Sequence, residues 1–345
     1  MLEIEIILLT NNVVKPFQKF HKEKNLKFIE FNKLYVTKCL AEHGLGFLIN
    51  IWEIINSNGS IKKKLAKKII FDVGGTNLTY LHNLSVTNLS IKDVDSIVLS
   101  HWHYDHVGGL YKILEEIEEK IPIYTHYFAK FERFFRRSND VKPSDLRGKS
   151  YEEIKPLLLD SKIVNQEPID LALIENLGGD VKFTTQDIKI LDSEKLKIWV
   201  SGEIPRVFAD EDFTDYFSLQ DNEILKEDKI LDDRCIIIEF QDRIIVLNGC
   251  CHSGLKNTLK HIISHINKPI SQIIGGFHMA SSSEERLNSS IDYLRDIPKF
   301  ENKLFLFPIH CTGDKFLKKL ESKKIPSIHG FDVSVGTVFK FSSSN

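Results

Sequence analysis

Residues 100–109 read SHWHYDHVGG, with three histidines and one aspartate inside six consecutive positions. The segment just before them, VDSIVLS at residues 94–100, has the apolar character of a buried strand. The end of a strand is rigid and can hold side chains in fixed positions. Imidazole and carboxylate groups are common ligands of divalent metals. We therefore predict a metal site whose core is His101, His103, Asp105 and His106.

The spacing within this cluster favours two neighbouring ions. His101 and His103 are close enough on a tight loop to share one ion, and we expect Asp105 and His106 to face a second. Paired ions about 3.5–4 Å apart can stabilise developing negative charge. The alternative is a chance cluster of solvent-facing histidines, but it does not explain the preceding strand or the glycine pair at 108–109, which allows a sharp turn.

Three later loops carry further candidates, each directly after an apolar strand. The loops are GCCHSG at residues 249–254, GGFH at 275–278 and PIHCTG at 308–313. They contribute Cys250, His252, His278 and His310. A lone histidine is more often structural than functional, and free cysteines usually behave as small buried residues. Their repeated position after strands nevertheless favours a place near the metal site.

Composition indicates an ordinary globular protein with a substantial core. The 345 residues are 42% hydrophobic and 27% charged, with a net charge of −2, which argues against a dedicated nucleic-acid binder. Five cysteines without regular spacing do not resemble a disulfide framework. Glu3 and Glu5 do not suit a signal peptide, and no apolar run approaches the about 20 residues that cross a bilayer. We expect a cytoplasmic protein without membrane or nucleic-acid partners; its oligomeric state stays open.

The order of strand and helix patterns predicts an α+β protein. A unit of strand, loop and helix recurs in both halves, which indicates two sheets packed face to face with helices outside. Residues 126–190 begin with an aromatic and basic run and continue with a helical, polar pattern, so we expect a helical insertion or lid. Residues 209–233 are acidic and without clear periodicity, and we expect a long loop there.

These motifs have a known parallel. The cluster from His101 to His106 resembles the HxHxDH signature of the metallo-β-lactamase superfamily, and FDVGG at 71–75 resembles the aspartate-bearing strand end that precedes it in that family. The resemblance implies a four-layer αββα sandwich spanning residues 1–345 as one domain. It also implies that Asp72 steadies the metal loop without binding the metal itself.

The resemblance leaves the remaining ligands partly open. PIHCTG resembles the last histidine motif of the family, which makes His310 a ligand. Cys250 stands where most members carry a bridging aspartate, so the bridge is in doubt. His252 could supply the ligand normally given by another segment, because no histidine lies near SGEIPR at residues 201–206. Zinc is the favoured metal, and magnesium, manganese or iron are alternatives.

The combined loop motifs resemble one subgroup, typified by an archaeal dihydropterin-ribofuranosylaminobenzene phosphate synthase of methanopterin-type cofactor biosynthesis. The resemblance implies a transferase that joins two phosphorylated small molecules, a dihydropterin pyrophosphate and a ribofuranosylaminobenzene phosphate, and releases pyrophosphate. We expect Asp105 and His278 to act at the reacting groups and Arg206 to fork onto a phosphate. The aromatic and basic run around Phe128, Phe134 and Arg136 could stack a pterin, or form an amphipathic helix with a buried face.

Two other classes of function remain. A metal-dependent hydrolase of a phosphodiester, lactone or thioester is the main alternative, since one fold hosts many reactions. The third is a non-enzymatic sensor that uses Cys250, Cys251 and Cys311. No DNA-binding or receptor domain pattern accompanies these cysteines, so we favour an enzyme.

Overall fold

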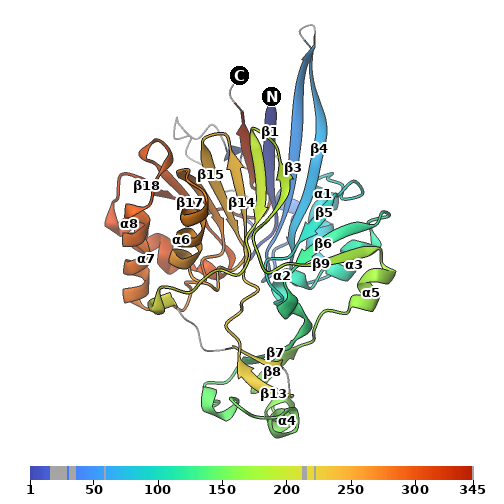
Figure 1. Ribbon diagram of the computed structural model, residues 1–345, viewed down its shortest axis with the longest axis vertical. Helices are drawn as coiled ribbons and strands as arrows, with labels where there is room; N and C mark the ends of the chain where they lie inside the picture. Colours follow the sequence, from blue (N-terminus) through green and yellow to red (C-terminus); the bar gives the residue numbers. More distant parts are fainter. Residues whose placement is uncertain (16–28, 31–35, 58–59, 212–215, 221–222, 344–345) are drawn as a thin grey trace.

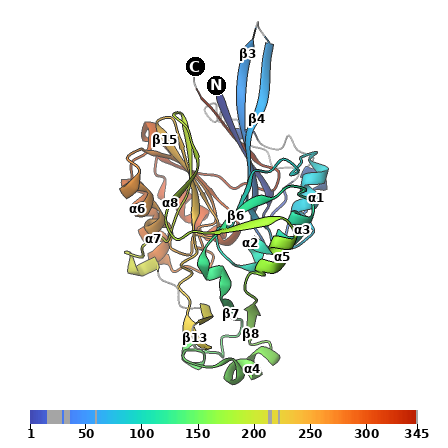
Figure 2. The same cartoon turned by 45° about the vertical axis from the view of Figure 1, so that its right-hand side comes forward.

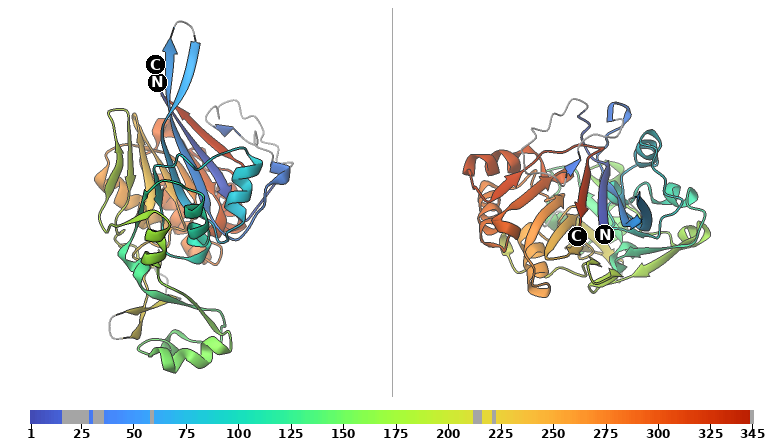
Figure 3. Two further views of the ribbon diagram at one scale, coloured as in Figure 1. Left: turned by 90° about the vertical axis from the view of Figure 1, so that its right-hand side faces the viewer. Right: turned by 90° about the horizontal axis from the view of Figure 1, so that it is seen from above.

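Two large sheets pack face to face and carry helices on their outer sides (Figure 1). The computed structural model describes residues 1–15, 29–30, 36–57, 60–211, 216–220 and 223–343. Both described chain ends lie in one sheet, because β1 pairs antiparallel with β19. Seen from above, the helices flank the paired sheets on both sides (Figure 3). This is the expected four-layer αββα arrangement.

The first sheet has eight strands and mixed direction. Its order is β2 (Ile29–Glu30), β19 (Val338–Ser342), β1 (Leu2–Thr10), β3 (Gly46–Ser57), β4 (Ser60–Val73), β5 (Ser96–Val98), β6 (Ile121–Thr125) and β9 (Gly179–Phe183). The helices α1 (Thr79–Val86), α2 (Tyr104–Val107), α3 (Leu110–Glu115) and α5 (Leu171–Asn176) accompany it. The long hairpin of β3 and β4 extends beyond the rest of the sheet (Figures 1 and 2).

The second sheet has seven strands. Its order is β10 (Ile188–Asp192), β11 (Leu196–Val200), β14 (Cys235–Phe240), β15 (Arg243–Asn248), β16 (Ile270–Gly275), β17 (Leu304–Pro308) and β18 (Ile328–Gly330). The helices α6 (Leu255–His265), α7 (Glu284–Asp296) and α8 (Asp314–Lys323) cover its outer face. Every residue of β14 and β16 is buried, as expected for Ile-rich strands enclosed by a second sheet and a helix layer.

Three apolar layers follow from this arrangement. The layer between the sheets includes Phe47, Phe71 and Phe307, all fully buried. The other two layers lie between each sheet and its helices. A sheet that is apolar on both faces needs cover on both, which explains the four layers. Among the described residues, no helix is both long and apolar enough to cross a membrane.

A small lobe lies below the two sheets (Figure 2). Its sheet has the order β13 (Ile224–Glu227), β12 (Tyr216–Gln220), β7 (Glu132–Arg136) and β8 (Ile163–Gln166), and α4 (Tyr151–Leu159) packs on it. Short 3-10 turns occur at Val36–Lys38, Tyr127–Lys130, Pro143–Asp145, Ala209–Glu211, Phe300–Asn302 and His310–Thr312. The lobe has its own apolar centre around Phe134, Ile154 and Phe217.

The lobe corrects two expectations. The helical insertion over residues 126–190 is only partly helical: α4 and α5 lie in it, but its aromatic run forms β7, and its end supplies β9 and the start of β10 in the large sheets. The expected loop at 209–233 contains β12 and β13; its residues 212–215 and 221–222 lie outside the described part of the chain. The reason is pairing at a distance, since β7 pairs with β12 some 80 positions away. The pairing of β7 with β12 therefore outweighed the helical preference of the local sequence.

Candidate metal centre

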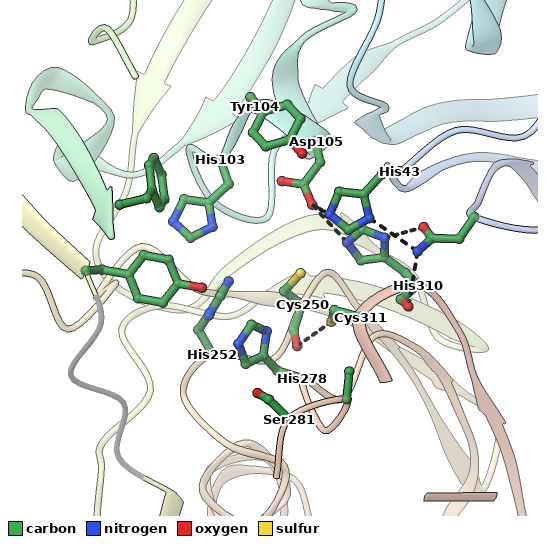
Figure 4. A pocket seen from close by; sticks show the side chains of 14 residues that line it. His43, His103, Tyr104, Asp105, Cys250, His252, His278, Ser281, His310 and Cys311 are labelled. Atoms are coloured by element: carbon green, nitrogen blue, oxygen red, sulfur yellow. Dashed lines mark hydrogen bonds and ion pairs between the residues drawn. The ribbon is translucent and has the colours of Figure 1, made fainter. Parts of the chain in front are cut away.

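The candidate ligands meet because strand ends meet. β15, β16 and β17 run parallel, so the loops that follow them leave the same edge of their sheet. β4 and β5 are also parallel, and the loop after β5 carries the histidine cluster. The two edges face each other, and the four loops converge between the sheets and the lobe (Figure 4).

A first ligand group lies around His101. Its Nε2 lies 3.0 Å from Nδ1 of His103. The His252 ring centroid lies 4.8 Å from that of His101 and 4.7 Å from that of His103. Ligand atoms of His101, His252 and Cys250 all lie within 4.8 Å of one another. Two imidazoles and a thiol therefore converge, with the His103 ring beside them.

A second group lies beside it. Asp105, His106, His310 and Cys250 offer ligand atoms that lie within 4.8 Å of one another. Asp105 Oδ2 is 3.1 Å from His310 Nε2, and Cys250 Sγ is 3.1 Å from His106 Nε2. Cys250 thus belongs to both groups, and Figure 4 shows it between His252 and His310. The Cys250 sulfur atom is therefore within reach of both groups.

His278 and Cys311 extend the cluster on the far side of Cys250. These three residues form a third set of ligand atoms within 4.8 Å of one another. The His278 ring centroid is 4.2 Å from that of His252, and the backbone φ of His278 is +48°. A non-glycine residue in this left-handed region is uncommon and often marks a functional loop.

Asp72 and Ser100 hold the histidine loop from behind. The Asp72 carboxylate is fully buried; its Oδ2 lies 2.7 Å from His106 Nδ1 and accepts a hydrogen bond from Ser100 Oγ at 2.7 Å. Ser100 Oγ also lies 2.8 Å from His101 Nδ1. These contacts orient the Nε2 atoms of both rings toward the centre, as partners of metal-binding histidines usually do. A Cβ on Gly249 would lie 2.2 Å from Ser100 Oγ, so only glycine fits there.

Burial and charge set the protonation states. Burial lowers the pKa of His103 to about 3, and the charge of Arg133 adds to this shift, so the imidazole is neutral. Burial disfavours a charge on Asp105, but His106 and hydrogen bonds from His310 and His43 hold its pKa well below the usual range. Burial opposes a charge on His106 too, yet Asp72 and Asp105 raise its pKa to about 9. Metal binding at His106 would therefore release a proton.

A cavity of about 310 Å³ opens onto the cluster. His43, Asp105 and His310 line it (Figure 4), and Phe135 and Tyr216 from the lobe line it as well. The Tyr216 ring stacks near His103, with centroids 5.2 Å apart at 28°. The lobe therefore supplies an aromatic surface next to the candidate ligands.

Comparison with known proteins agrees with this geometry. The family model of the metallo-beta-lactamase superfamily matches residues 64–185. A protein of Methanocaldococcus jannaschii, the uncharacterized protein MJ0448, is 30% identical over 302 residues, which cover 86% of this chain and 93% of that protein. The chain belongs to the metallo-β-lactamase superfamily.

Two further relatives of this superfamily are informative. The 7,8-dihydropterin-6-methyl-4-(β-D-ribofuranosyl)-aminobenzene-5'-phosphate synthase of M. jannaschii is 29% identical over 290 residues, or 81% of this chain and 84% of that protein. The crystal structure of Tm1679, described as a metal-dependent hydrolase of the β-lactamase superfamily, superposes with a TM-score of 0.64 at 17% identity and covers 99% of this chain and 100% of that one. The second likeness bears on the fold, and the first supports an enzyme of related function.

The donor set fits a divalent metal of the kind common in this superfamily. His101 Nε2 and His103 Nδ1 approach to 3.0 Å, close to the about 3.3 Å separation of two nitrogens on one tetrahedral zinc ion. Imidazoles, a carboxylate and a cysteine thiolate are the ligands that zinc binds in proteins.

Arg206 does not lie where the sequence suggested. Its guanidinium donates to the backbone carbonyl oxygens of His252, at 2.9 Å, and of Lys229. It is absent from the residues that line the cavity. These contacts give no support to a role of Arg206 at a phosphate: its side chain holds the backbone of the His252 loop.

Asp232 and Asp233 have similar structural tasks. Asp232 Oδ2 accepts a hydrogen bond from the Trp102 backbone N–H at 2.7 Å, and Asp233 Oδ2 accepts one from Ser253 N–H at 2.7 Å. Both carboxylates are buried. These bonds fasten the loop after β5 and the loop after β15 to the segment that precedes β14. Neither aspartate lines the cavity.

His43 is a site residue that the sequence analysis missed. Its Nε2 lies 3.3 Å from Asp105 Oδ2, and its ring stacks on His310 with centroids 5.0 Å apart. It belongs to the turn before β3, where Leu45 N–H donates to the Asp105 carbonyl oxygen at 3.0 Å. The only signal in the sequence was a histidine next to Gly44 and ahead of an apolar strand, which is too common a pattern to single out.

Proposed function

We propose that the protein is a metal-dependent transferase that condenses 6-hydroxymethyl-7,8-dihydropterin pyrophosphate with 4-(β-D-ribofuranosyl)aminobenzene 5'-phosphate and releases pyrophosphate. The observation that carries the proposal is similarity to the synthase of that name over 290 residues, a span that includes most of the chain. Pyrophosphate leaves with concentrated negative charge, and a cluster of metal ligands beside a cavity suits that reaction.

Two sets of residues would hold the metal. His101, His103 and His252 would form one set, Asp105, His106 and His310 the other, with Cys250 shared by both. Divalent ions, with zinc favoured by the thiol and imidazoles, would supply positive charge for the departing pyrophosphate. Asp72 would keep His106 in place throughout the reaction, and Ser100 would do the same for His101.

The chain itself would orient the two substrates. Phe135 and Tyr216 offer aromatic faces at the cavity wall, against which a planar pterin or aminobenzene ring can pack. In the condensation the arylamine nitrogen forms a bond to the pterin methylene carbon, the bond from that carbon to pyrophosphate oxygen breaks, and the nitrogen loses a proton. His278 lines the cavity outside the two main ligand sets, so we assign it the acceptance of this proton.

To test this proposal, purified protein of known metal content is incubated with both substrates. Coupled product and pyrophosphate are followed together by mass spectrometry. The His101→Ala/His103→Ala double variant should lose coupled product, whereas His82→Ala, which changes a histidine bonded to the Lys38 carbonyl, should keep it. Bis-p-nitrophenyl phosphate and a lactone panel run in parallel. Hydrolysis of a panel ester without any coupling would move the function to the metal-dependent hydrolase.

A further inference from the structure

A second group of metal-ligating side chains lies on the outer layer of the molecule, apart from the cavity. His261 and His265 lie one turn apart on α6, and Asp187 precedes the edge strand β10. Residues four apart on a helix share one face, and a histidine pair with this spacing is a known zinc-binding arrangement. None of the three residues lines the catalytic cavity.

The three side chains converge. Asp187 Oδ1 lies 2.9 Å from His261 Nε2, and the two imidazole centroids are 4.5 Å apart. One ligand atom from each residue falls within 4.8 Å of the others. Ligands of a tetrahedral zinc ion lie about 3.3 Å apart. Because His265 is exposed, a modest rotation of its ring can close the remaining gap.

The hydrogen bonds of His265 leave its Nε2 lone pair available to bind an ion. His265 Nδ1 lies 2.8 Å from the His261 carbonyl oxygen, which can only accept, so this nitrogen carries the hydrogen and Nε2 keeps its lone pair. The Ser264 hydroxyl donates to the same carbonyl at 2.8 Å and so does not compete. Such a bond to a backbone carbonyl is the usual support of a metal-binding histidine.

His261 adds an independent sign. The side chain is about nine-tenths buried, and its Nδ1 has no hydrogen-bond partner among the described residues. Because Asp187 Oδ1 can only accept, Nε2 donates to it in the absence of an ion, and the buried Nδ1 keeps a lone pair without a partner; such atoms are uncommon. The pair also lies in the last turns of α6, where the helix dipole favours a cation.

We propose that Asp187, His261 and His265 bind a divalent transition-metal ion, zinc by ligand chemistry, with water completing the coordination. This site is separate from the catalytic centre. Asp187 Oδ1 also accepts a hydrogen bond from the Gly202 backbone N–H at 2.7 Å, and α6 begins directly after the loop at 249–254. The ion connects the edge strand β10 of the seven-stranded sheet to α6, the helix that follows Cys250 and His252.

The test compares zinc content per chain in the full-length protein. Wild type, His265→Ala and His82→Ala are equilibrated with buffered free zinc, freed of loose metal by gel filtration, and measured by mass spectrometry of the metal. His265 is exposed, so its replacement should not affect folding. His265→Ala should hold one zinc fewer than wild type, while His82→Ala should match wild type. Equal zinc in all three would overturn the proposal and leave only a hydrogen bond between Asp187 and His261.

A second measurement separates this site from the catalytic one. The His101→Ala/His103→Ala variant should still show a zinc-dependent rise of Tm, because the site on α6 is unchanged in it. Adding His265→Ala to that variant should abolish or reduce the rise. A zinc response that is unchanged by His265→Ala would contradict the site, whatever the outcome for the catalytic activity.

Discussion

Arg133 is the largest polar side chain buried beside the candidate metal centre. Its Nε lies 3.2 Å from Asp228 Oδ2, its Nη2 lies 2.6 Å from Asp232 Oδ1, and its Nη1 donates to the Trp102 carbonyl oxygen at 3.2 Å. All three charged side chains are almost fully buried. One cation therefore joins β7 of the lobe to the segment before β14 and to the histidine loop.

Arg133→Met should strongly destabilise the protein. The change leaves two buried carboxylates without their cation, which costs about 3–5 kcal/mol. Urea unfolding followed by circular dichroism would measure the loss. Arg147→Met is the matched control, because its partner Glu227 is at 3.2 Å on the surface and such pairs contribute about 0–1 kcal/mol. Equal stability of the two variants would show that Asp228 and Asp232 are not charged in the folded protein.

Asp72→Asn tests how the histidine loop is held. The amide keeps the shape of the side chain but cannot accept as strongly from His106 Nδ1, now 2.7 Å from Asp72 Oδ2. We expect zinc affinity to fall about 10- to 100-fold, measured against a competing chelator. Asp180→Asn, at an exposed carboxylate paired with Lys182, should leave the affinity unchanged. An unaltered affinity in Asp72→Asn would mean that backbone rigidity alone orients the ligands.

At the scale of elements, β7 and β12 connect the lobe to the centre. Alternate residues of β7 face opposite ways, so Phe134 fills the lobe centre while Phe135 reaches the cavity. On β12, Phe217 likewise faces the lobe centre, and Tyr216 faces the cavity. Two short paired strands thus anchor the lobe and present aromatic rings to a substrate.

Tyr216→Ala should weaken substrate binding and leave the metal in place. An aromatic pair contributes about 0.5–1.5 kcal/mol beyond its buried area, so KM for the ring-bearing substrate should rise about 3- to 10-fold. Tyr216→Phe keeps the ring and should stay near the wild-type value. Steady-state kinetics with metal analysis of each variant checks this. A loss of metal in Tyr216→Ala would instead show that the stacked His103 depends on the ring.

At the scale of the whole molecule, the centre joins segments that are far apart in sequence. His101 to His106 follow the eight-stranded sheet, whereas Cys250, His252 and His310 follow the seven-stranded sheet. An ion bound by both sets would connect the two halves of the sandwich. Only the folded chain brings these ligands together, so metal binding adds to stability.

Removal of metal by a chelator should therefore lower Tm. At a free metal concentration a thousandfold above Kd, binding contributes about 4 kcal/mol. In a chain of this size that corresponds to a decrease of roughly 5–10 °C. Scanning calorimetry with and without chelator measures it, and readdition of zinc should restore the original value. The His101→Ala/His103→Ala variant should respond less, and an equal response would place the stabilising ion elsewhere.

The sequence by itself determined the family, the layered α+β fold and several of the residues that meet at the candidate centre, though not His43. The reason is that this information is local: His101 to His106 lie on six consecutive positions, and the later ligands each follow an apolar strand within a glycine-containing loop. The strand predicted at residues 94–100 is present as β5 (Ser96–Val98). The role of Asp72 was implied by the resemblance of FDVGG at residues 71–75 to a family motif, which is also local.

Only the tertiary structure decided the features that depend on distant pairing. β7 became a strand because β12 pairs with it, and no local pattern carries that information. Cys250 lies between two ligand groups, Arg206 turns to backbone carbonyls, and His43 reaches Asp105, because loops from opposite sheets meet at one edge. Sequence marks which residues carry chemistry, whereas the packing of the two sheets and the lobe sets the distances between them.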